Sequence, residues 1–174
     1  MPSSFIAVIR LALVVCACFV GVRDSYGQSP APAGSTTRGG THLYVLLGLG
    51  NNSPGLAEFG SKMERRGIPT TVRNYGDWPS LAQEAVAQYK SGRLRSIEIV
   101  GHSLGGNAAR DMAAELGKAG VPVQLVVTLD PTGSSAVSPN VRHSVNFVPR
   151  SGEDHLSMIA ARERDITSYV LGGR

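Results

Sequence analysis

The chain has 174 residues, a formal net charge of +4 and a hydrophobic fraction of 42%. This length allows one domain with a proper core and is too short for two ordinary domains. The basic bias is mild and its longest run is the pair Arg65 and Arg66, so the composition gives no signature of nucleic-acid binding.

The first segment in chain order has the composition of an export signal. Arg10 precedes an apolar run over residues 11–22, and the small residues Ser25 and Gly27 offer a cleavage point. Charged residues directly after the run argue against a bilayer-spanning helix. We expect a signal peptide over residues 1–27 and an exported protein, periplasmic or secreted, with no stable membrane span once the signal is removed. An uncleaved N-terminal anchor is the alternative.

Two further features separate this segment from the folded domain. Both cysteines, Cys16 and Cys18, lie within it, so the mature chain would have no disulfide and no cysteine nucleophile. Residues 28–40 are rich in Pro, Ala, Gly, Ser and Thr and are expected to form a flexible linker. The catalytic domain is expected over residues 41–174.

Strand-like and helix-like segments alternate through this domain. Residues 43–47 form an apolar run typical of a strand buried on both faces. Further strands are predicted at residues 69–72, 96–100, 121–129 and 144–148, and helices follow Ser53-Pro54, Ser80, Gly105 and residue 156. The alternation predicts an α/β fold, a three-layer sandwich in which a mostly parallel sheet of about five or six strands lies between helices.

A serine between two glycines follows the predicted strand 96–100. The run Gly101-His102-Ser103-Leu104-Gly105 joins that strand to a helical pattern. This spacing is typical of a nucleophile elbow, a tight turn that strains the serine backbone and exposes its hydroxyl. Chance matches are easier in a chain with 21 glycines, and the flanking strand and helix are what favour the elbow.

A serine nucleophile needs a base, and the chain holds four histidines. His42 and His143 lie at the amino ends of predicted strands, and His102 is expected to point away from Ser103. Only His155 lies on a loop beyond the carboxyl end of a strand, where the functional groups of parallel sheets gather. We therefore expect His155 to be the base, with an ordinary surface residue as the alternative.

The base needs a carboxylate to orient it. Asp130 ends the predicted strand beside the elbow and is well placed to accept a hydrogen bond from His155. The alternative for Asp130 is an Asp-Pro turn. Asp154, adjacent to His155, is more consistent with a helix cap.

Backbone N–H groups are expected to stabilise negative charge on the substrate. The N–H of Leu104, at the start of the elbow helix, is one candidate, and that of Leu49, in the turn after the first strand, is the second. Gly48 and Gly50 permit close approach there. An ordinary loop is the alternative for this turn.

With these residues located, the chain resembles the α/β-hydrolase family over most of residues 42–170. The resemblance is to the lipase and thioesterase branches, and is carried by GHSLGG at 101–106, VVTLDPTG at 126–133 and DHLSMI at 154–159. It implies a trimmed family fold with the catalytic residues Ser103, Asp130 and His155. The family's first antiparallel strands are missing or reduced, and no insertion is long enough for a substantial lid, which implies an open groove.

The function expected is that of an exported serine hydrolase, cleaving carboxylic ester or thioester bonds of a small-molecule substrate through an acyl-enzyme on Ser103. No cofactor and no metal are expected. One alternative is a hydrolase-like binding protein without catalysis. The other is a nucleotide-binding module, suggested by Gly48-Leu49-Gly50, although Ser53 stands in place of a third glycine.

Overall fold

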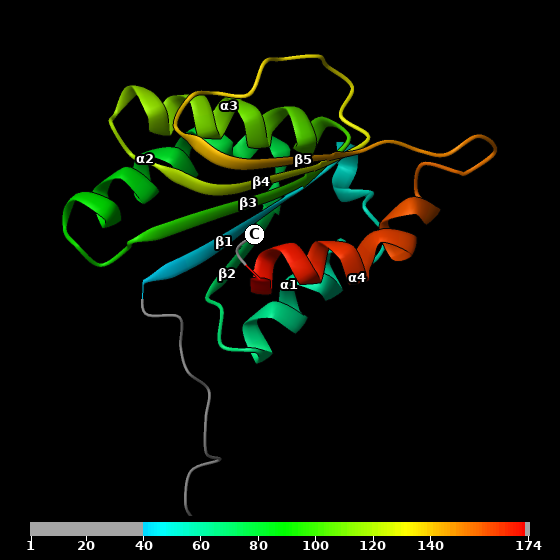
Figure 1. Ribbon diagram of the computed structural model, residues 1–174, viewed down its shortest axis with the longest axis horizontal. Coiled ribbons are helices and arrows are strands. Elements are labelled where there is room, and N and C mark those ends of the chain that lie inside the picture. Colours follow the sequence, from blue (N-terminus) through cyan, green and yellow to red (C-terminus); the bar gives the residue numbers. More distant parts are fainter. Residues whose placement is uncertain (1–39, 173–174) are drawn as a thin grey trace, which may run out of the picture. The chain divides into compact units, whose positions relative to one another are not determined.

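The computed structural model describes residues 40–172. The predicted signal peptide, residues 1–27, and nearly all of the predicted linker, residues 28–40, lie outside the described residues. In chain order the elements are β1 (Thr41–Leu47), the short 3-10 turn η1 (Leu49–Asn51), α1 (Leu56–Arg65), β2 (Thr70–Asn74), the 3-10 turn η2 (Tyr75–Asp77), α2 (Trp78–Lys90), β3 (Ser96–His102), α3 (Leu104–Lys118), β4 (Val123–Leu129), β5 (Val141–Phe147) and α4 (Ser157–Gly172) (Figure 1).

The five strands form one sheet in the order β2-β1-β3-β4-β5, and every neighbouring pair is parallel. Because all strands run the same way, their carboxyl ends share one edge of the sheet. The chain winds outward in both directions from β1 and β3, so the topological switch point lies between these two strands. In doubly wound sheets of this order, ligands bind at the carboxyl end of the switch point.

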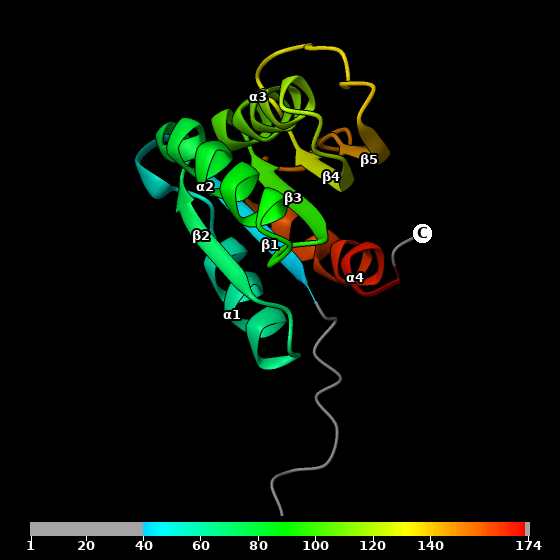
Figure 2. The ribbon, with the colours of Figure 1, turned by 90° about the vertical axis from the view of Figure 1, so that its left-hand side faces the viewer.

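Helices cover both faces of the sheet. One core cluster joins α2 and α3 to the sheet, and a second joins α1 and α4 to the opposite face (Figure 2). Side chains of β1 alternate between the two, since Tyr44 and Leu46 belong to the first cluster and Val45 and Leu47 to the second. The predicted three-layer α/β sandwich is therefore confirmed, with a wholly parallel sheet of five strands within the described residues.

Element boundaries differ from the prediction where contacts outside the local pattern decide them. The helix expected from Ser80 begins at Trp78, because η2 runs directly into it and Pro79 is tolerated in a first turn. Strand β5 begins at Val141, three residues earlier than expected, because that residue pairs with Val123 of β4. Within residues 40–172, no helix has both the length and the apolar character needed to cross a membrane.

Candidate functional site

Ser103 occupies the sharp turn between β3 and α3 that the motif predicts. Its backbone has φ 55° and ψ −122°, a conformation that non-glycine residues rarely adopt and that is common at functional sites. A Cβ atom added to Gly101 would lie 2.0 Å from the carbonyl oxygen of Gly105, and one added to Gly105 would lie 2.0 Å from the carbonyl oxygen of Leu46. The two glycines are therefore required for the turn to pack against β1.

Main-chain hydrogen bonds fix this turn to the next strand. The N–H of Ser103 donates to the carbonyl oxygen of Leu129 at 2.9 Å, and the carbonyl oxygen of Ser103 accepts from the N–H of Gly106 at 2.9 Å. The side chain of Ser103 stays partly exposed. The structure thus presents this hydroxyl at the carboxyl edge of the sheet, at the switch point.

Asp130 follows β4 directly and also has a positive φ, 45°. Its N–H donates to the carbonyl oxygen of Phe147 on β5 at 2.8 Å. One oxygen of its carboxylate, Oδ2, lies 3.5 Å from Nδ1 of His155. This distance is longer than that of an ordinary hydrogen bond. The structure therefore brings Asp130 and His155 into contact.

His155 lies on the segment 148–156 between β5 and α4, which we call the histidine arm. Its imidazole is 49% exposed, and its ring centroid lies 5.5 Å from that of His102, the residue before Ser103. The arm therefore carries the imidazole of His155 to the elbow.

Three polar side chains hold the histidine arm. Glu153 accepts from the backbone N–H of Arg150 at 2.8 Å, and its carboxylate pairs with the buried guanidinium of Arg162 on α4 at 2.9 Å. Asp154 accepts from the N–H groups of Leu156 and Ser157, so its predicted role as a helix cap is confirmed. The position of His155 thus depends on side-chain contacts beside it in the chain.

The two predicted backbone donors, Leu104 and Leu49, each open a helical turn. The first N–H groups of a helix have no partner inside it, and the N-terminus of α3 adds the positive end of a helix dipole. Leu49 is 68% exposed, and Gly48 before it would place a Cβ 3.4 Å from Cβ of Ser103. Both residues stand beside the elbow, and their part in stabilising charge stays a prediction.

The sequence prediction missed two residues of this region, Ser53 and His102. Their side chains are buried and bond to each other, with 3.0 Å between Oγ of Ser53 and Nδ1 of His102. Ser53 stands where a dinucleotide-binding turn has its third glycine, and its hydroxyl is used inside the protein, which speaks against that interpretation. No local sequence pattern predicts this hydrogen bond, because the two residues are 49 positions apart in the chain.

Burial lowers the pKa of His102 below 6.5, and the neighbouring His155 lowers it further, while Asp130 and the backbone of His155 oppose these effects. His102 is therefore neutral at pH 7. The two remaining histidines lie away from the site. His42, near the amino end of β1, pairs with the hydroxyl of Thr71 at 2.8 Å, and His143 is exposed on β5.

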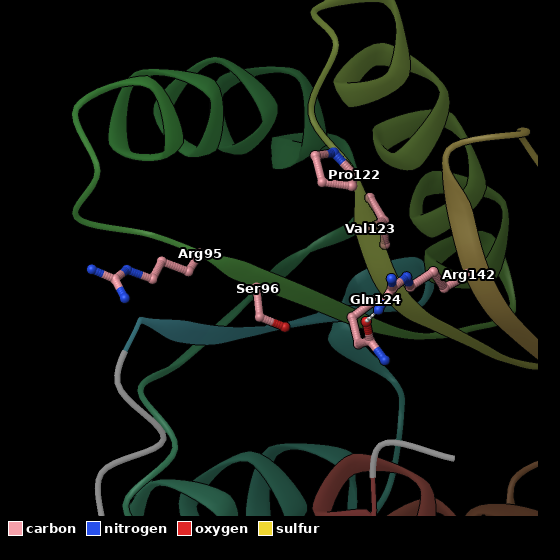
Figure 3. A pocket seen from close by; sticks show the side chains of 6 residues that line it. All are labelled: Arg95, Ser96, Pro122, Val123, Gln124 and Arg142. Atoms are coloured by element: carbon pink, nitrogen blue, oxygen red, sulfur yellow. Dashed lines mark hydrogen bonds between the residues drawn. The ribbon is translucent and has the colours of Figure 1, made fainter.

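A pocket of about 190 Å³ lies at the opposite edge of the sheet, at the amino ends of β3, β4 and β5. Figure 3 shows that Arg142 points to Gln124, whereas the guanidinium of Arg95 extends away from them. Its lining therefore does not converge on one point, and none of the predicted site residues is part of it. Among residues 40–172 there is no group of three His, Cys, Asp or Glu side chains arranged to hold a metal ion.

Comparison with known proteins gives few relatives. No model of a known protein family matches the chain, and no curated protein matches its sequence. Among solved structures the chain is similar to a 3-dehydroquinate dehydratase-like protein from Bifidobacterium longum, with 16% sequence identity and a TM-score of 0.36. The similarity covers 75% of this chain and 98% of the other. A likeness at this level carries no activity over to this chain.

These comparisons correct the family and the activity expected from the sequence. The solved structure is named for a dehydratase and not for a hydrolase, and no family model supports the resemblance to α/β-hydrolases. The chain is accordingly not assigned to the lipase or thioesterase branches, nor to ester or thioester hydrolysis. Three short motifs had carried that assignment. They describe the elbow, the end of β4 and the start of α4, which specify a local site and not a family.

Proposed function

We propose that Ser103 is a nucleophile, that His155 is its general base and that Asp130 orients the base. The observation that carries the proposal is the strained turn at Ser103 beside the contact between His155 and Asp130. A strained serine backbone has a cost of about 1–3 kcal/mol, and such residues cluster at functional sites. No packing role of Ser103 accounts for that cost, because its side chain stays partly exposed.

In this proposal each nitrogen of His155 has a separate task. Nδ1 faces the carboxylate of Asp130, which leaves Nε2 to take the proton from Oγ of Ser103 as Oγ attacks an electrophilic centre. A bond forms between Oγ and that centre, its bond to the leaving group breaks, and the proton passes from His155 to the leaving group. The N–H groups of Leu104 and Leu49 would stabilise the negative charge that develops on the electrophile.

The test is covalent labelling with a fluorophosphonate probe, followed by mass spectrometry of the intact protein and its peptides. The wild type should gain one probe adduct on Ser103, and Ser103→Ala should gain none. Ser134→Ala, at an exposed position of the loop between β4 and β5, is the matched control and should label like the wild type. Folded wild-type protein that does not react, or labelling that survives in Ser103→Ala, would contradict the proposal.

The sequence supports a second proposal, about the cellular location of the protein, and this proposal concerns residues outside the described part of the chain. Arg10 followed by the apolar run 11–22 supports cleavage after residue 27 and export. Mass analysis of the mature N-terminus after expression of the full chain tests it. A mature protein that retains residues 1–27 would contradict cleavage.

A further inference from the structure

A second serine and histidine pair lies beside the first but is inaccessible. Ser53 is 5% exposed and His102 is fully buried, whereas the imidazole of His155 is half exposed. Substrate can reach Ser103 and cannot reach Ser53. The buried pair is therefore built for a role other than nucleophilic attack.

The hydrogen bonds of Ser53 connect the turn after β1 with the end of β3. The N–H of Gly48, in the turn after β1, donates to Oγ of Ser53 at 2.9 Å. Oγ of Ser53 is also hydrogen-bonded to Nδ1 of His102, 3.0 Å away, at the end of β3.

The turn after β1 also has main-chain hydrogen bonds of its own and a bond from Nδ2 of Asn74 to Oδ1 of Asn51 at 2.8 Å. Gly50 and Asn51 both have positive φ, 60° and 61°, and the side chain of Leu49 is largely exposed. The turn lies in close contact with the elbow, since a Cβ added to Gly48 would lie 3.3 Å from the carbonyl oxygen of His102. Ser53 adds a side-chain hydrogen-bond link between this turn and the end of β3.

We infer that Ser53 and His102 are positioning residues, which hold the Gly48–Leu49 backbone beside Ser103 so that the N–H of Leu49 meets the charge formed during attack. This inference rests on the proposed role of Ser103 as nucleophile. Neither side chain touches the reacting atoms. Ser53 acts through the turn after β1, and a small displacement of that turn removes a donor from the reaction. His102 also packs beside His155, with 5.5 Å between the ring centroids, so Ser53→Ala is the variant that isolates the turn.

The test measures the rate of fluorophosphonate labelling at saturating probe and the probe concentration that gives half of that rate. In Ser53→Ala the saturating rate should fall about 10- to 100-fold, because losing one donor to a developing oxyanion costs up to about 10³-fold. The half-saturating concentration should stay the same, since the lost interaction belongs to the transition state. His102→Leu should show at least the same loss, and the double variant should be no slower than His102→Leu alone.

Two variants separate positioning from general damage. His102→Asn keeps an acceptor close to the position of Nδ1, so it should recover most of the rate lost in His102→Leu. Thr71→Val removes the other hydroxyl–imidazole bond, that of Thr71 with His42 at 2.8 Å near the amino ends of the strands, and should leave the rate unchanged. If Ser53→Ala does not fold, Ser53→Cys replaces it, and a fall of about tenfold is expected because a thiol is a weak donor.

The outcomes distinguish this inference from the proposal on which it rests. Wild-type rates in folded Ser53→Ala, or equal losses in Ser53→Ala and Thr71→Val, would overturn the positioning role while Ser103 remains the nucleophile. Labelling that persists in Ser103→Ala would overturn the nucleophile itself. A loss in Ser53→Ala that appears only in the half-saturating concentration would also overturn the inference, because it would indicate a probe-binding role.

Discussion

The elbow and the histidine arm are held by different kinds of interaction. Main-chain packing fixes Ser103, since two glycines touch neighbouring carbonyl groups and its N–H bonds to β4. The arm that carries His155 is held by side-chain contacts, chiefly that of Glu153 with the buried Arg162. The position of the nucleophile is therefore part of the core, while that of the base depends on a few substitutable contacts. Changes at the elbow should affect folding, and changes in the arm should affect reactivity.

The largest expected effect is the loss of the base. His155→Ala should slow labelling of Ser103 at least about 10³-fold, because the hydroxyl then keeps its proton during attack. His143→Ala, at an exposed position of β5, is the control and should react like the wild type. Equal losses in the two variants would show that His155 is not the base.

At the elbow, Gly105→Ala tests whether packing fixes the serine. Helix propensity alone would stabilise this variant by up to about 1 kcal/mol. The added Cβ would lie 2.0 Å from the carbonyl oxygen of Leu46, so a net destabilisation of about 3 kcal/mol is expected in urea unfolding. Gly172→Ala, where a Cβ meets nothing within 4 Å, should be close to neutral. Similar unfolding midpoints for the two variants would remove the contrast between the regions.

In the arm, Glu153→Gln should lower reactivity more than stability. Weakening the contact with Arg162 frees the segment before His155, and a misplaced base is expected to slow labelling about tenfold. The matched variant is Glu163→Gln on α4, which weakens a partly exposed pair with Lys62 of α1 and should label normally. A Glu153→Gln variant with wild-type rates would mean that the arm is held by other contacts.

The same carboxylate gives a pH test. The N–H of Arg150 and the charge of Arg162 lower the pKa of Glu153 below its usual 4.5. As the pH falls, the unfolded chain therefore takes up a proton on Glu153 before the folded protein does. The stabilisation from the ionised carboxylate is complete above the pKa of the unfolded chain and is lost as the pH falls through the pKa of the folded protein. Acid should therefore lower the urea midpoint of the wild type more steeply than that of Glu153→Gln. Parallel curves would contradict this role.

The smallest expected effect is at the helix cap. Asp154→Ala removes the acceptor for the N–H groups of Leu156 and Ser157 and should destabilise the protein by about 1 kcal/mol. Asp154→Asn keeps an acceptor oxygen and should recover most of this loss. If both variants unfold with the wild type, the cap contributes nothing measurable.

The sequence predicted the layers of the fold and the sharp turn at Ser103, because both follow from local patterns. Apolar runs alternating with helical stripes specify a parallel sheet, and G-x-S-x-G marks the turn at Ser103. Contacts between distant segments escaped prediction. The bond between Ser53 and His102 joins residues that only the sheet brings together, and β5 begins earlier than its apolar pattern because of its pairing with β4. The family and activity also could not be read from the motifs, since a local turn does not determine chemistry.

One main-chain bond has a consequence for how the site can move. The N–H of Ser103 is bound to the carbonyl oxygen of Leu129, and the next residue is Asp130. Ser103 follows β3 and Asp130 follows the adjacent strand β4, so the hydroxyl and the carboxylate move together with the sheet. Movement of the histidine arm then changes the distance from the imidazole of His155 to both groups, without disturbing the core that supports them.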